Sequence, residues 1–316
     1  MKQTWLILVV VPLLFGLNFL DAKPLPKVGE SLRLKFTKGV VYFLEMETMT
    51  EQKMKVMDQD VNQNQEQTVV IQVSPEALLD DGDWLVGVQV VGMKMKINIG
   101  GNKVEFDSTK NEPASPMVSS FDAIVKTQFK ATFGPNGELK RFIGRDEMLK
   151  KLAIASPGQD GPLKSLLTES ALKKMFTPIG DFLPDRPGRV GTHWNRQGEV
   201  DLGPVGKYVY DHQYTYHDTI REVHEIRAKT TMKFQPPPKN NGALPFAIVA
   251  VKATKSVGQG AYHFDASIGR LKESVHELQF KATMQIRIGN MNSDIELEQK
   301  QTTKARSFDR NPFQSK

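Results

Sequence analysis

RDEMLKKLAIASPGQDGPLKSLLTESALKKMFTPIGDF, residues 145–182, is the stretch around which the rest of the chain is organised. After the apolar N-terminal segment it is the one part whose pattern predicts helix. Met148, Leu149 and Leu152 fall on one face of a short helix. A Pro/Gly break follows, and residues 163–175 repeat apolar side chains at steps of three and four. We therefore expect two amphipathic helices that cover a sheet, or that plug or close a cavity.

The flanking sequence predicts two β-rich blocks, residues 23–144 and residues 183–299, with alternating apolar strands and Gly/Pro turns. The strongest hairpin signal of the first half is Gly134-Pro135-Asn136-Gly137. Residues 52–66 fit a strand with one wet face or a loop, and residues 111–116 fit a loop. We predict a mainly β fold of antiparallel sheets, either a curved half-barrel or two pseudo-repeated β blocks, with a central α-helical segment. The polar tail, residues 300–316, is expected to fray.

The composition limits the possible partners. A chain of 316 residues with 39% hydrophobic residues suggests one large or two ordinary domains. The net charge of +6 permits an anionic lipid or acidic polysaccharide partner, but it indicates neither. The Lys and Arg residues are dispersed and form no long basic run, so no nucleic-acid partner is expected.

The N-terminus predicts export. Lys2 precedes the apolar run Trp5–Leu17, and Ala22 offers a small residue for cleavage. Residues 1–22 therefore fit a secretory signal peptide, with an uncleaved membrane anchor as the alternative. After cleavage, membrane contact would be peripheral at most. The chain has no Cys, which excludes a bacterial lipoprotein anchor and favours the periplasm or surface of a bacterium over a eukaryotic secreted protein.

A tyrosine ladder is the most distinctive candidate site. Its members occupy alternate positions, so a strand places all five on one face. The ladder consists of Tyr208, Tyr210, His212, Tyr214 and Tyr216. Because tyrosine is apolar with one hydroxyl that needs a partner when buried, the ladder could line a cavity for a greasy or sugar ligand. It could equally pack against a neighbouring layer with its hydroxyls at the rim.

Other chemistry has little support. His212 and His217 have opposite strand parity, and the chain contains neither a His-Glu-x-x-His motif nor Cys, so no metal site is expected. No nucleophile elbow, phosphate-binding loop or dinucleotide fingerprint occurs, so no cofactor is expected. Catalytic groups often meet only in space, so the sequence leaves an enzyme open while favouring a non-enzymatic protein.

Motifs of the second half carry a family resemblance. They are Leu183-Pro184-Asp185-Arg186-Pro187, then Gly191-Thr192-His193-Trp194, and then Tyr262-His263-Phe264-Asp265 with Gly269-Arg270-Leu271. Together they resemble a family of exported bacterial proteins of unknown function. The resemblance implies export and a β-rich fold, and it implies no substrate. The architecture is also similar to the periplasmic half-barrels with a helical plug that carry lipoproteins or lipids.

We expect a non-enzymatic exported envelope protein that binds an apolar or amphiphilic ligand, such as an envelope lipid, in a β cavity. The alternatives are a secreted hydrolase with dispersed site residues and a polysaccharide- or surface-binding module. An apolar cavity would favour the first, converging carboxylates or a Ser–His pair the second, and a flat exposed aromatic strip the third. The sequence indicates neither the ligand nor the oligomeric state.

Overall fold

The fold is that of a computed structural model, which describes residues 32–56, 59–110, 116–125, 127–155, 167–201, 206–237, 247–288 and 290–314. The predicted signal peptide, residues 1–22, lies outside the described residues. So does most of the first half of the second predicted helix, residues 163–166.

Twelve strands are found in the described part of the chain, and all of them belong to one sheet. They are β1 (Tyr42–Val56), β2 (Gln59–Leu78), β3 (Trp84–Ile99), β4 (Asn102–Asp107), β5 (Gln128–Phe133), β6 (Leu139–Ile143), β7 (His193–Asp201), β8 (Lys207–Ile220), β9 (Val223–Gln235), β10 (Ala247–Asp265), β11 (Arg270–Ile288) and β12 (Met291–Phe308). The helical elements are α1 (Pro116–Val125), α2 (Arg145–Ala155), α4 (Glu169–Phe176) and the 3-10 turn η3 (Thr177–Ile179).

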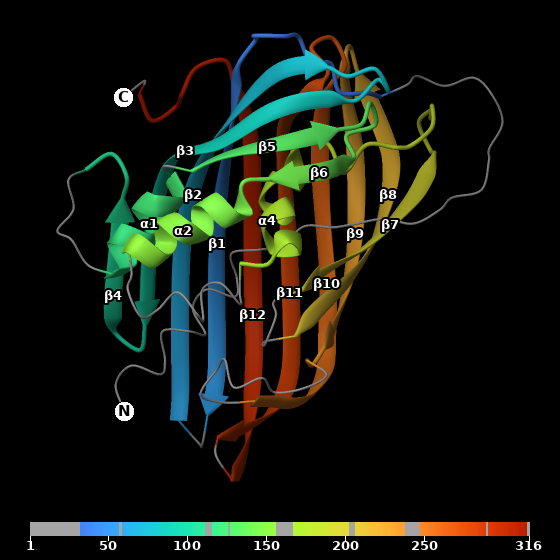
Figure 1. The fold of residues 1–316 in the computed structure, drawn as a ribbon. Helices are drawn as coiled ribbons and strands as arrows, with labels where there is room; N and C mark the ends of the chain where they lie inside the picture. Colours follow the sequence, from blue (N-terminus) through green and yellow to red (C-terminus); the bar gives the residue numbers. More distant parts are fainter. Residues whose placement is uncertain are drawn as a thin grey trace.

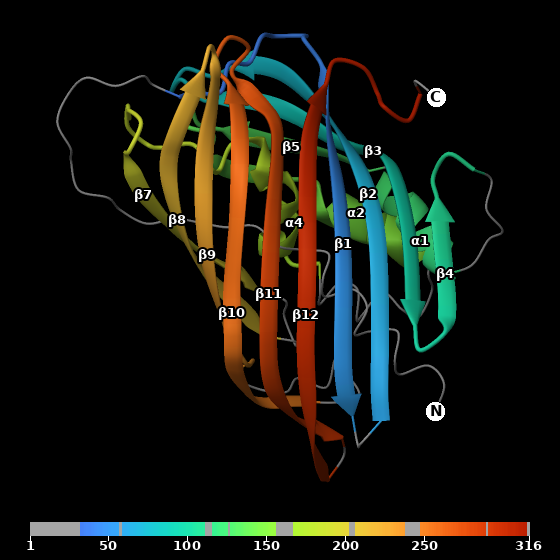
Figure 2. The same ribbon diagram turned by 180° about the vertical axis from the view of Figure 1, so that it is seen from behind.

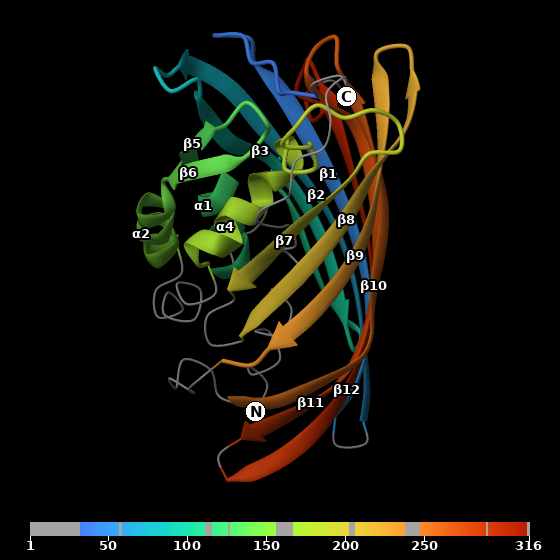
Figure 3. The ribbon, with the colours of Figure 1, turned by 90° about the vertical axis from the view of Figure 1, so that its right-hand side faces the viewer.

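The sheet is antiparallel, strongly curved and open. Its order is β6-β5-β3-β2-β1-β12-β11-β10-β9-β8-β7, and β4 pairs with the far half of β3. The first and last strands of the chain, β1 and β12, pair along almost their whole length at the middle of the sheet. That pairing joins the two predicted β blocks into one sheet, which confirms the mainly β class and gives the curved half-barrel (Figures 1 and 3).

The helices lie on the concave face, and the long strands form the convex back of the molecule (Figure 2). Met148 and Leu152 of α2 are buried, as the spacing predicts, and Leu149 packs against the core. Among the described side chains of α4, those of Ala171, Leu172 and Phe176 are buried. Burying such side chains stabilises the fold by about 1.5–3 kcal/mol each, so the helical layer and the concave face share one core.

A backbone contact between two glycines joins the end of the helical layer to the β5–β6 turn of the sheet. Gly137, in the β5–β6 turn, has φ 83°, and a Cβ there would lie 2.2 Å from the carbonyl oxygen of Gly180. Gly180 follows η3 directly. The predicted hairpin turn at 134–137 is therefore also the point where the segment after the helices meets the sheet, and glycine is required for both reasons.

Two expectations are wrong. Residues 300–308 do not fray but complete β12, paired on both sides. Beyond them Phe313 lies against Gly92 of β3, close enough to leave no room for a Cβ. Residues 116–125 form α1, so helix is not confined to 145–182. Polar residues on the inward face of β12 hide the apolar alternation that would have revealed the strand.

Candidate functional site

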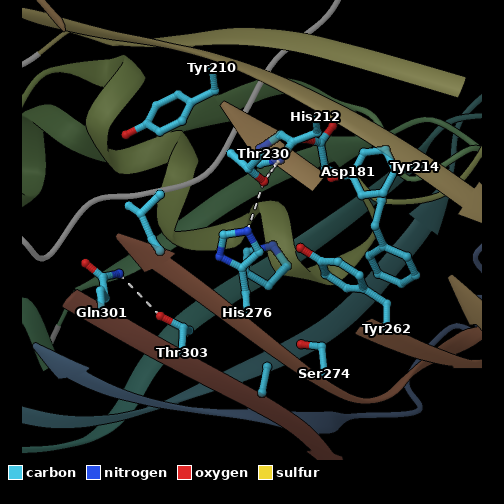
Figure 4. A pocket seen from close by; sticks show the side chains of 14 residues that line it. Asp181, Tyr210, His212, Tyr214, Thr230, Tyr262, Ser274, His276, Gln301 and Thr303 are labelled. Carbon is cyan, nitrogen blue, oxygen red and sulfur yellow. Dashed lines mark hydrogen bonds between the residues drawn. The ribbon is translucent and has the colours of Figure 1, made fainter. Parts of the chain in front are cut away.

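A cavity of about 90 Å³, called the inner cavity below, lies between the concave face and the segment that follows α4 (Figure 4). Strands β8 to β12 supply one wall, and Pro178, Asp181 and Phe182 supply the other. The inner cavity is a small, partly open space at the contact between the helical layer and the sheet.

The tyrosine ladder faces this interior. All five side chains are buried, and none is more than 6% exposed. Tyr210, His212 and Tyr214 line the inner cavity, whereas Tyr208 and Tyr216 lie beyond its two ends. The alternation therefore predicted correctly that the five side chains share one face. The tertiary structure places only the middle three of them at the inner cavity.

The two outer tyrosines have structural surroundings. Tyr208 meets Phe234 edge to face, with ring centroids 4.9 Å apart, and it also contacts Phe280. The hydroxyl of Tyr216 lies 2.8 Å from Oγ1 of Thr219 and also bonds Nδ1 of His224. Each ring packs in the core, and the hydroxyl of Tyr216 is satisfied near the β8–β9 turn.

Aromatic stacking joins the segment Pro178–Phe182, called the cover below, to the sheet. Phe182 stacks on Tyr262 of β10, with ring centroids 4.8 Å apart. Tyr262 in turn meets Tyr214 edge to face at 6.0 Å. Burial, and then the neighbouring carboxylate of Asp181, raises the pKa of both tyrosines well above the usual range. The phenols are therefore neutral at physiological pH and able to donate hydrogen bonds.

Two histidines meet at one threonine. Nδ1 of His212 bonds Oγ1 of Thr230 on β9, and Nε2 of His276 on β11 lies 3.0 Å from the same oxygen. The two rings are nearly perpendicular, with centroids 6.0 Å apart. Figure 4 shows the three side chains converging at the centre of the site. The Thr230 hydroxyl thus links strands β8 and β11 through a polar chain on the concave face.

Glycines in β10 make room for this chain. Gly258 and Gly260 occupy the positions that His276 must cross to reach β9, and a Cβ on Gly260 would lie 2.8 Å from the ring atom Cδ2. Burial lowers the pKa of His276 to about 4, against a smaller opposing effect of Glu277. His276 is therefore a neutral imidazole at pH 7.

A buried arginine fixes the segment Leu183–Pro187, called the connector below, which follows the cover. Arg196 on β7 faces His212 across the strand pair, and its side chain is 2% exposed. Its Nη2 donates to the carbonyl oxygen of Leu183 and, at 2.8 Å, to Oδ1 of Asp185. The Leu183–Asp185 part of the connector motif is therefore held against the sheet by a charge-assisted pair.

No metal-binding cluster occurs among the residues that the structure describes. His212 and His217 do lie on opposite faces, because the first is buried and the second is exposed. In the described ranges, every helix is too short or too polar to cross a bilayer.

The candidate residues taken from the sequence omit eleven of the fourteen residues that line the inner cavity. Asp181, Thr230, Tyr262 and His276 are among the eleven. A signal existed for His276, because it lies two positions before Leu278 and so shares the inward face of that apolar strand. For Asp181 no pattern could have helped, since its place depends on how the segment after α4 turns back onto the sheet.

These features define a class: an open, curved antiparallel sheet whose concave face holds a helical cover over an internal cavity. The chain belongs to a family of unknown function, DUF6263, whose model matches residues 81–271. The match extends from β3 to the start of β11 and takes in the helical segment and the tyrosine ladder. The resemblance to a family of unknown function is therefore confirmed. No curated protein matches the chain.

Solved structures give only a faint likeness. The outer membrane protein OprG from Pseudomonas aeruginosa is 7% identical over 86% of this chain and 97% of its own, with a TM-score of 0.22. An outer membrane channel from Pseudomonas putida F1 is 5% identical over 89% of this chain and 100% of its own, with a TM-score of 0.23. At such scores the likeness carries no argument about this chain.

Proposed function

We propose that this protein is a non-enzymatic binding protein that takes the apolar part of an envelope amphiphile into the inner cavity. The observation that carries the proposal is the cavity itself, whose walls include the rings of Tyr210, Tyr214 and Tyr262 and the side chain of Leu278. Such a wall is mostly apolar with a few polar groups, as ligand sites usually are.

The size of the cavity restricts the manner of binding. Drug-sized ligands occupy roughly 300–1,000 Å³, so about 90 Å³ admits only part of one. A longer ligand must displace the cover at Pro178–Phe182. That segment is held by the Gly137–Gly180 contact and by the Phe182–Tyr262 stack, rather than by a strand ladder. The cover is therefore the element that we expect to move when ligand enters.

Export, and with it a place in the periplasm or at the cell surface, remains part of the proposal and rests on residues 1–22. The direct test is native mass spectrometry of mature protein purified from a bacterial periplasm, with organic extraction of bound material. A lipid or other amphiphile of defined mass is the expected result. A protein that is free of ligand at several expression levels would count against binding.

A secreted hydrolase is the second candidate, because Ser274, His276 and Asp181 all line the inner cavity. Against it, the hydrogen bond of His276 goes to Thr230, and among the described residues none joins His276 to Ser274. Release of nitrophenol from a short-chain nitrophenyl ester, compared between wild type and Ser274→Ala, separates the two candidates. Activity that disappears in Ser274→Ala would replace the binding proposal with a catalytic one.

The third hypothesis, a polysaccharide-binding surface, lacks the exposed aromatic side chains on which it depends. It requires an exposed aromatic strip, and the ladder is buried beneath the helical layer.

A further inference from the structure

A band of uncharged polar side chains crosses the concave face next to the inner cavity. We call it the glutamine belt, and it consists of Thr50, Gln52, Gln63, Gln65, Gln299 and Gln301. Each of these side chains is more than nine-tenths buried. Polar side chains such as glutamine are rarely buried without hydrogen-bond partners. A buried group of five glutamines and one threonine therefore needs a physical explanation.

Strand register brings the belt together. Gln52 on β1 faces Gln63 on β2 and Gln299 on β12. One inward position further on, Thr50 faces Gln65 and Gln301 in the same way. The belt is thus two rows of three side chains across the middle of the sheet. Gln301 belongs to the belt and also lines the inner cavity, so the two sites are continuous.

Part of the belt is satisfied internally. Nε2 of Gln299 donates to Oε1 of Gln301 at 3.3 Å, and Nε2 of Gln301 donates to Oγ1 of Thr303 at 3.3 Å. Nε2 of Gln65 donates to Oε1 of Gln67 at 3.4 Å. These bonds run along β12 and β2, and among the described residues they leave several belt atoms on β1 and β2 without a partner.

The remaining groups are buried and unpartnered among the described residues. They are Oγ1 of Thr50, Oε1 of Gln52, both amide atoms of Gln63 and Oε1 of Gln65. Leaving buried donors and acceptors without hydrogen bonds is unfavourable, so a group outside the described residues must bond them. Gln63 offers a donor and an acceptor at one point, which suits a hydroxyl or an amide better than an aprotic group.

The surroundings of the belt restrict the charge and shape of an occupant. All six belt side chains are neutral, and an ion buried against them would lose its hydration without gaining a counter-charge. Along the strands, Met54 and Leu297 adjoin the belt on one side, and Met46 and Ala305 lie two inward positions beyond it on the other. A polar zone between apolar zones is complementary to an amphiphile rather than to a free sugar or an ion.

We propose that the glutamine belt binds the uncharged, hydrogen-bonding head group of the amphiphile whose apolar part enters the inner cavity. This inference rests on the proposed function and adds the class of ligand: a hydroxyl- or amide-bearing neutral lipid. Water alone is the alternative occupant, because buried polar groups that lack protein partners are commonly bonded by ordered water.

Three probes with one dodecyl-length chain test the head-group preference by calorimetry below their aggregation concentrations: monolauroylglycerol, laurate and dodecyltrimethylammonium. We expect wild-type protein to bind the neutral glycerol ester about tenfold or more tightly than either ion. The belt variant Gln52→Met/Gln63→Met, which keeps side-chain length and removes the amides, should lose about that factor for the ester and leave the two ions unchanged.

The matched control is Gln259→Met/Gln279→Met, two exposed glutamines on the outer face of β10 and β11, and it should bind all three probes as wild type does. Equal affinities for the three probes in wild type, or an unchanged preference in a folded belt variant, would overturn the head-group assignment and leave water as the occupant. Failure of every probe to bind wild type would overturn the proposed function itself. The wild-type preference needs no mutant, so a belt variant that fails to fold does not prevent the test.

Discussion

His276 reaches across strand β10 to Thr230, with Nε2 of the imidazole 3.0 Å from the hydroxyl Oγ1. The contact can span two strand spacings because Gly258 and Gly260 leave the inward face of the intervening strand without side chains at these two positions. Nδ1 of His212 bonds the same hydroxyl from the other side. One threonine therefore positions two histidines at the wall of the inner cavity. The protonation state of His276 should affect the free energy of unfolding of the protein.

Lowering the pH should destabilise the protein through His276. Its pKa is about 4 in the folded protein, against about 6.5 in the unfolded chain. Between these values the unfolded chain binds a proton that the folded protein does not, so this residue's contribution to stability is complete above about pH 6.5 and lost as the pH falls toward 4. We expect His276 to account for about 2–3 kcal/mol of the loss between pH 7.5 and pH 4.5.

Urea unfolding at those two pH values, in wild type and in His276→Gln, measures this contribution. The loss on acidification should be smaller in the variant by about 2 kcal/mol. The other titratable or polar groups around the ring, His212, Asp181, Tyr262 and the flanking Glu277, are retained in both proteins. Equal losses in the two proteins would contradict a neutral, buried His276.

Replacing Gly137 should loosen the cover. Gly137 and Gly82 share φ 83°, but a Cβ on Gly82 would meet nothing within 4 Å, whereas one on Gly137 would collide with the backbone of Gly180. Gly82→Ala should therefore cost only the left-handed backbone term, about 1–2 kcal/mol. Gly137→Ala should cost about 1–3 kcal/mol more, because overlap with backbone cannot be relieved by a rotamer change.

Thermal unfolding of the two variants provides the comparison. Equal stability losses would mean that the segment after η3 does not press on the β5–β6 turn. If the cover regulates entry, as proposed, Gly137→Ala should also speed the release of bound amphiphile, while Gly82→Ala should not.

Removing Asp185 should destabilise the connector. Asp185 pairs with the buried Arg196, so Asp185→Ala removes the carboxylate partner of a guanidinium that also donates to the Leu183 carbonyl. We expect a loss of about 1–3 kcal/mol, reduced from the fully buried case because Asp185 itself is 54% exposed. The measurement is the free energy of unfolding in urea.

The control is Glu199→Ala, which removes a pair with Lys207 on the neighbouring strands. The side chains of Lys207 and Glu199 are 39% and 54% exposed, and their charged atoms lie 2.9 Å apart. Such pairs contribute about 0–1 kcal/mol. A larger loss for Glu199→Ala than for Asp185→Ala would show that burial of Arg196 is not what gives its pair its strength.

The tyrosine hydroxyls at the cavity should matter for ligand and not only for packing. Tyr210→Phe/Tyr214→Phe keeps both rings and removes two buried hydroxyls, so retention of a bound amphiphile should fall by about tenfold. Tyr216→Phe lies on the same strand face but outside the cavity, so it should affect stability and leave retention unchanged. Native mass spectrometry of the three proteins gives the answer, and unchanged retention in the double variant would remove the cavity role of the ladder.

Pattern reasoning succeeded where inward-facing residues are apolar. Apolar residues alternate from Leu278 to Ile286 and are buried on one face of β11, as a strand period requires. The helical spacing of Met148 and Leu152 likewise predicted the buried face of α2. It failed where inward-facing residues are polar. In β12 the inward positions Gln299, Gln301 and Thr303 carry no apolar signal, so a strand at the centre of the sheet resembled a fraying tail.

The sequence by itself determined the mainly β class, the central helical segment and the shared face of the tyrosine ladder, because strand and helix periods are local and are written in adjacent residues. Only the tertiary structure decided that β1 pairs with β12, that Tyr210, His212 and Tyr214 meet His276 and Tyr262, and that six neutral side chains form one buried belt. Those outcomes depend on strand register and sheet curvature, which bring together residues more than two hundred positions apart, and no local period records them.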